Sequence, residues 1–192
     1  MRTRLVIVPA VLTVVAAGVV WAQASSGSSG KPSETQVVLG TMHQLNRLEV
    51  RLGRLAERKG TRLDIRRYGA LLTRDHHFGN QEVTKVVHAG RLTLPPLKEL
   101  PAATMLEAAG KRAGQLGQAS GVSFDRSFLA MAVQTHEMAI RMLKAARDRL
   151  PAGKARRLVS RVLPILEQDA KLAQDIEGRG LPMRDQAVGM GG

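Results

Sequence analysis

The chain has no cysteine and very few aromatic residues. Without cysteine, disulfides, thiolate metal ligands and cysteine nucleophiles are excluded, so packing alone or packing around a ligand must hold the fold. An aromatic content of 3% excludes the rows of stacking rings on which single-stranded nucleic acids bind. Helix-turn-helix and zinc-finger spacings, Gly-rich phosphate loops and the G-x-S-x-G motif are also missing. We therefore expect no specific recognition of nucleic acid and assign no catalytic residue.

Acidic residues are scarce relative to basic ones. There are 29 Lys and Arg against 16 Asp and Glu, which gives a formal net charge of +13 at pH 7. Such a surface attracts anionic partners such as lipid headgroups, lipopolysaccharide, acidic glycans or nucleic acid. The alternative interpretation is that Arg-rich solvent faces follow from a GC-rich genome. Anionic envelope components are thus possible partners, and the sequence leaves the oligomeric state open.

The first 24 residues have the three parts of a secretory signal peptide. A short basic segment precedes an apolar run over residues 5–20, and Ala22-Gln23-Ala24 supplies the small residues that a signal peptidase requires. We expect cleavage near Ala24, export to the periplasm or cell surface of a bacterium, and no transmembrane span in the mature protein. The alternative is an uncleaved anchor, because a run of this length can span a membrane. Residues 25–33 have the composition of a flexible linker.

The remaining sequence indicates helices and no strands. Ser33 followed by Gln36 is a capping box that predicts a helix start, and Gly60 is well placed to end that helix. The predicted helices cover about residues 34–59, 62–89, 102–118, 123–149 and 152–177, the third being short, with a disordered tail over 178–192. This order predicts an all-α, ferritin-like four-helix bundle over residues 34–177. Two antiparallel hairpins would be joined by a long crossover that contains the short helix.

Ionisable residues interrupt the apolar face of every long helix. At 100° per residue, four of them fall within or at the centre of these faces: Glu49, Asp75, His136 and Asp169. His76 falls at one edge of the face of its helix. If the turns at Gly60 and Pro151 lie at the same end of the bundle, a rise of about 1.5 Å per residue places the four in one layer.

Such a layer needs partners, because burying lone carboxylates costs several kcal/mol each. Carboxylates with imidazoles suit iron, manganese or zinc, and helical bundles build metal centres from inward-facing Glu and His. The candidate metal ligands are Glu49, Asp75, His76, His136 and Asp169, with His43 and Glu82 as outer candidates. The alternative is a closed hydrogen-bonded network without metal. The absence of a Glu-x-x-His spacing from the second and fourth long helices favours that alternative.

The segment from His43 to Ala56, His-Gln-Leu-Asn-Arg-Leu-Glu-Val-Arg-Leu-Gly-Arg-Leu-Ala, resembles a known motif. It is similar to the H-x-x-N-x-x-E-x-x-x-G-x-L-A opening of a bacterial family of exported, ferritin-like domains of unknown function. Members are often labelled outer-membrane or periplasmic proteins. The resemblance extends over most of the chain through Asp75-His76, Ser123-Phe-Asp-Arg-Ser-Phe-Leu129, His136 and Leu163-Pro-Ile-Leu166. Where the family usually has a fourth-helix histidine, this chain has Asp169. The resemblance implies the fold and brings no established reaction.

Two functions are open at this point. The first is a non-enzymatic envelope protein, with a stress-related role as one option, whose basic surface associates with anionic envelope components. The second is a ferritin-like protein that binds iron, manganese or zinc in the core of its bundle. Neither hypothesis requires a cofactor other than the metal.

Overall fold

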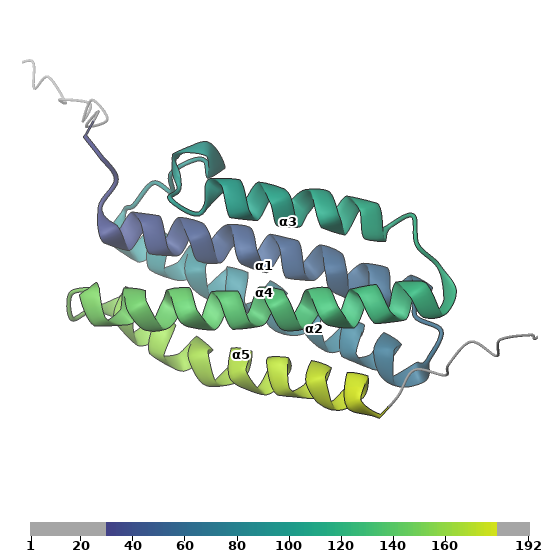
Figure 1. Ribbon diagram of the computed structural model, residues 1–192. Coiled ribbons are helices and arrows are strands. Elements are labelled where there is room, and N and C mark those ends of the chain that lie inside the picture. The colour runs from purple at the N-terminus through teal and green to yellow at the C-terminus, as the bar shows by residue number, and fades with distance from the viewer. Residues whose placement is uncertain (1–29, 180–192) are drawn as a thin grey trace, which may run out of the picture. The chain divides into compact units, whose positions relative to one another are not determined.

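A computed structural model describes residues 30–179, and the helical unit begins at Pro32. Its elements are α1 (Glu34–Lys59), α2 (Leu63–Gly90), the short 3₁₀ helix η1 (Leu97–Glu99), α3 (Ala103–Leu116), α4 (Gly121–Arg149) and α5 (Lys154–Gly178). The described part has no strands, so the predicted all-α class is confirmed (Figure 1). No helix in residues 30–179 is long and apolar enough to cross a membrane. The predicted signal peptide, most of the linker and nearly all of the predicted tail lie outside the described residues.

The start of α1 is fixed by the capping box. The Ser33 side chain accepts a hydrogen bond from the Gln36 backbone N–H (3.3 Å), and the Gln36 side-chain oxygen accepts one from the Ser33 N–H (3.1 Å). Two backbone donors that the helix leaves unpaired are satisfied in this way. At the other end, the Gly60 N–H donates to Ala56 O at 2.9 Å. α1 therefore begins and ends at positions marked by local sequence.

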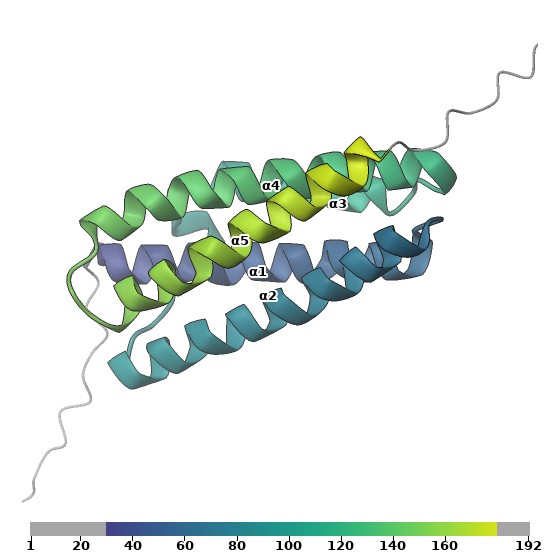
Figure 2. The same cartoon turned by 90° about the horizontal axis from the view of Figure 1, so that it is seen from below.

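α1 and α2 form a hairpin whose backbones touch. A Cβ atom added at Gly53 would lie 2.5 Å from Gly69 O, and one added at Gly69 would lie 2.6 Å from Gly53 O. Only glycine at both positions permits this approach. α4 and α5 form the second hairpin, and the two hairpins meet through α1 against α4 and α2 against α5 (Figure 2).

α3 carries the chain from one end of the bundle to the other, alongside α1 (Figure 1). Asp125, at the start of α4, accepts a hydrogen bond from Thr61 N–H at 3.0 Å. At the opposite end Arg149, the last residue of α4, pairs with Glu34 at 2.9 Å. α1 and α4 are therefore antiparallel, so the turns at Gly60 and Pro151 lie at opposite ends. The same-end arrangement considered above is wrong, because the 14 residues of α3 span about 21 Å of the bundle before α4 begins.

The apolar core is divided into two clusters. One lies toward the Glu34 end and includes Leu39, Val83, Leu143 and Leu158. The other lies toward the Gly60 turn and includes Leu52, Tyr68, Phe128 and Ile176. Between them every long helix places polar or ionisable side chains: Asn46, Glu49, His76, Thr135, His136 and Asp169. These residues lie near mid-helix, so they form one layer even though the turns are at opposite ends.

Candidate metal centre

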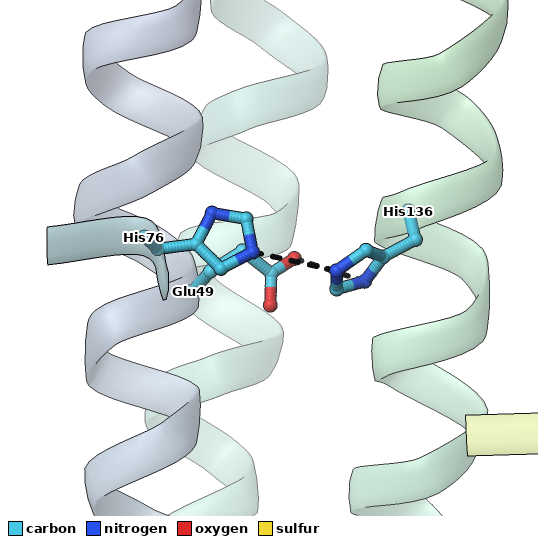
Figure 3. Close-up of side chains that lie close together, drawn as sticks. All are labelled: Glu49, His76 and His136. Carbon is cyan, nitrogen blue, oxygen red and sulfur yellow. Dashed lines mark hydrogen bonds and ion pairs between the residues drawn. The ribbon is translucent and has the colours of Figure 1, made fainter. Parts of the chain in front are cut away.

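Three ionisable side chains from three helices converge in this polar layer. Glu49 of α1, His76 of α2 and His136 of α4 each offer one ligand atom, and these atoms all lie within 4.8 Å of one another. Figure 3 shows the side chains pointing toward one another. Their relative exposures are 2%, 5% and 0%, so all three side chains are shielded from bulk solvent.

Hydrogen bonds at the Nδ1 atoms orient both imidazoles. His136 Nδ1 lies 2.8 Å from Ala132 O, which can only accept, so this nitrogen carries the proton. His76 Nδ1 lies 2.9 Å from Asn46 Oδ1 and donates to it in the same tautomer. Both Nε2 atoms are then left with lone pairs, and they face each other at 3.4 Å. Two lone pairs at this distance favour a cation between them.

The carboxylates of the layer stand close to His136 but do not hydrogen-bond to it. Glu49 Oε1 lies 3.8 Å from His136 Nδ1, and Asp169 Oδ2 lies 3.9 Å from His136 Nε2. Glu49 Oε2, Asp169 Oδ2 and Asn46 Nδ2 are buried without any hydrogen-bond partner in the described part of the chain. A closed polar network would have satisfied these atoms, since buried polar groups are nearly always paired.

Burial shifts the protonation of these groups away from their charged forms. It raises the pKa of Glu49 against the opposing effects of nearby His136 and Thr135. It also raises the pKa of Asp169 to about 6, with nearby Asp75 and Glu49 adding to the shift and His136 opposing it. Burial and the neighbouring His136 lower the pKa of His76 to about 3. At neutral pH His76 is therefore uncharged, and the two buried carboxyl groups near it have raised pKa values.

Two cavities adjoin the polar layer, and the larger one extends to the surface. A cavity of about 20 Å³ adjoins Glu49, His76 and His136, which is enough for one water-sized particle. A second cavity, of about 180 Å³, lies between α2 and α5 and is lined by His76 and Asp169. It extends to Phe78, whose side chain is exposed. The larger cavity therefore brings one side of the layer, at His76 and Asp169, close to the surface.

The placement of Asp75 and His76 is the reverse of the helical-wheel expectation. His76 is buried, whereas the Asp75 side chain is 24% exposed and pairs with Arg74 at 2.7 Å. Asp75 is not among the three residues that converge. It lines the larger cavity, where its charge acts on Asp169.

The outer candidates have other partners. His43 Nδ1 lies 2.7 Å from Asn80 Oδ1 on α2. Glu82 pairs with Lys85 at 2.6 Å and with Arg161 at 3.2 Å. These contacts join α1 to α2 and α2 to α5. His43 and Glu82 therefore connect neighbouring helices, and neither belongs to the group of three.

Asn46 was not among the sequence candidates, although it orients His76. Its position three residues before Glu49 is a signal that the sequence does contain, because residues i and i+3 share one face of a helix. Tyr68 also supports the layer, since its hydroxyl donates to Asp169 O at 3.1 Å. No sequence pattern marks that contact, which joins α2 to α5 across 101 residues.

Comparison with known families gives a match over most of the chain. Residues 21–176 match the family described as "Domain of unknown function (DUF4142)". No curated protein and no solved structure matches the chain significantly.

Proposed function

The chain belongs to the DUF4142 family of domains of unknown function, and from that premise we propose that it binds one divalent transition-metal ion inside a ferritin-like bundle. The ligands are Glu49, His76 and His136. Two imidazoles with a carboxylate form a ligand set that proteins use for zinc and for iron(II), and manganese shares the preference for carboxylate.

The observation that carries this proposal is the 3.4 Å separation of the His76 and His136 Nε2 atoms. A tetrahedral ion with metal–nitrogen bonds of 2.0–2.1 Å holds two nitrogen ligands about 3.3–3.4 Å apart. The two imidazoles thus already have the spacing that one ion requires. Glu49 supplies negative charge beside them. Asp169, which stands next to His136, is suited to complete or support the ligand set.

The unpaired atoms of the layer also favour a metal over a closed network. Glu49 Oε2 and Asp169 Oδ2 have no hydrogen-bond partner among the described residues. Leaving buried polar atoms unpaired costs about 1–3 kcal/mol each. A cation removes this cost for oxygen atoms that it binds, whereas the metal-free network leaves it in place.

Metal content and affinity test the proposal. Protein purified without chelator is analysed for metals, and apo protein is titrated calorimetrically with zinc, manganese and anaerobic iron(II). We expect one equivalent of at least one metal to bind. His76→Gln and His136→Gln should each weaken binding by more than about 100-fold. His77→Gln is the matched control, because His77 is the exposed neighbour of His76 and should leave the affinity unchanged.

Two results would contradict the metal site. One is less than about a tenth of an equivalent of metal together with no heat of binding for any of the three ions, since a site of this composition binds strongly at neutral pH. The other is equal weakening by the His77 and His136 variants, which would place the metal on the surface.

The proposed location is the periplasm or cell surface of a bacterium. The support is the signal-peptide pattern of residues 1–24. Intact mass measurement of protein recovered from the periplasm or culture medium should give a chain that begins at or near Ser25. A full-length chain found only in the membrane fraction would instead indicate the uncleaved anchor.

A further inference from the structure

Four arginines form a row on the outer face of α1. They are Arg47, Arg51, Arg54 and Arg58. Their spacings of four, three and four residues keep them within about 60° of one another around the helix, opposite its buried face. All four are exposed. Within residues 30–179, none has a carboxylate close enough for an ion pair. The row is therefore a line of uncompensated positive charge about 16 Å long.

Grooves flank this row on both sides. Between α1 and α3 a groove of about 420 Å³ is lined by Arg51, Arg54 and Arg58. Between α1 and α2 a second groove, of about 230 Å³, is lined by Arg47, Arg51 and Arg54 together with His77. No Asp or Glu lines either groove. Arg51 and Arg54 thus present their charges to both.

The α3 wall of the larger groove is made of small residues. They are Gly110, Ala113 and Gly114 of α3 and Gly117, which directly follows the helix. A Cβ atom added at Gly114 would meet nothing within 4 Å, and the nearest atom to one at Gly110 is an Arg51 guanidinium nitrogen at 3.8 Å. The groove therefore combines an arginine wall with an unobstructed opposite wall, which leaves space for a chain-like ligand.

We propose that this arginine groove, between α1 and α3, binds a segment of an acidic polysaccharide. Guanidinium groups bind carboxylate, sulfate or phosphate in a two-pronged geometry, and a row of them matches a linear series of anionic groups. A flat lipid bilayer could touch the arginines on the outer face of α1 but could not fill the groove between α1 and α3. Single-stranded nucleic acid would lack its usual stacking partners, because no Phe, Tyr or Trp lines the groove.

Charge-matched variants test the assignment. Heparin oligosaccharide serves as the probe, and its affinity is measured by calorimetry at low and at physiological salt. We expect R51Q/R54Q to weaken binding by about tenfold or more, as for the loss of charge-assisted hydrogen bonds. R156Q/R157Q removes the same charge from exposed positions on α5. We expect it to change the affinity less than about twofold, because it removes only long-range attraction that salt screens.

A steric variant separates a groove from a charged surface. Gly114→Phe fills open space without altering charge, so it should weaken heparin binding while circular dichroism shows an intact fold. Ala145→Phe, at an exposed position of α4, is its control. Three outcomes would overturn the proposal: no heparin binding, equal losses for the two arginine pairs, or no effect of Gly114→Phe. Tighter, Arg51- and Arg54-dependent binding of anionic vesicles or single-stranded DNA would also overturn the polysaccharide assignment.

Discussion

Asp169 carries a charge that the metal-free bundle does not stabilise. Its folded-state pKa of about 6 lies above the ordinary value of 3.8, so the folded protein binds more protons between these pH values than the unfolded chain. Stability therefore falls as pH rises through this window, and the penalty is complete above about pH 6. His76 acts in the opposite sense, because its lowered pKa removes stability as pH falls below the ordinary histidine range.

Replacing Asp169 by Asn should stabilise the metal-free protein at alkaline pH. At pH 8 we expect the free energy of unfolding to rise by about 1–3 kcal/mol, measured by urea denaturation with chelator present. The gain should fade toward pH 4, where the native carboxyl is already neutral, and the His76 effect cancels in the comparison. Asp175→Asn, at an exposed ion pair with Lys171, is the control. A gain independent of pH would show that burial of charge is not its cause.

The limits of sequence reasoning at this scale are visible in α2. If the apolar residues Leu71 and Phe78 are both assigned to the core of this helix, the centre of its buried face is calculated to lie near Asp75. Phe78 is in fact 55% exposed, and the true centre is set by residues such as Ile65 and Leu72. From that centre His76 lies about 20° away and Asp75 about 80°. A helical wheel locates a polar layer, but it cannot distinguish adjacent residues when an aromatic side chain stays in solvent.

At the scale of elements, backbone contact between α1 and α2 places Glu49 and His76 in the same layer. Gly69→Ala should disrupt this contact, because the new methyl group would lie 2.6 Å from Gly53 O and 2.7 Å from the Ala56 Cβ. We expect a loss of about 1–3 kcal/mol in unfolding free energy, although alanine has the higher helix propensity. Gly114→Ala, which meets open space, should instead gain up to about 1 kcal/mol. Thermal unfolding of both variants checks the pair, and an unchanged Gly69→Ala protein would refute the close packing.

The helices themselves were predictable from local signals, such as the capping box at Ser33 and Gln36 and the prolines after α2. The direction of the crossover was not. A short amphipathic helix can lie across the end of a bundle or along its side, and the choice depends on contacts made far along the chain. One of these is the hydrogen bond from Thr61 to Asp125, 64 residues apart. The sequence contains both residues but no signal that they meet.

At the scale of the whole molecule, the proposed ion should act as a stabilising ligand. A site saturated at one hundred times its dissociation constant adds about 2.7 kcal/mol to unfolding. For a domain of this size we expect the melting temperature to rise by about 5–10 °C. Differential scanning calorimetry with and without zinc measures the rise, and excess chelator should reverse it. Glu49→Gln/His136→Gln protein should show no rise; an equal rise in that variant would assign the effect to ions bound elsewhere.

The polar layer is supplied in equal parts by the two hairpins: Glu49 and His76 from α1 and α2, His136 and Asp169 from α4 and α5. Both apolar clusters are likewise shared between the hairpins. Two fragments of the chain, one for each hairpin, should therefore associate through this layer and the two apolar clusters. If the chain is cut between Arg91 and Leu92, the two fragments should reassociate, and zinc should tighten their association, because neither fragment alone holds both histidines. Sedimentation of the mixed fragments measures this dependence, and association insensitive to zinc would separate the assembly of the bundle from the chemistry at its centre.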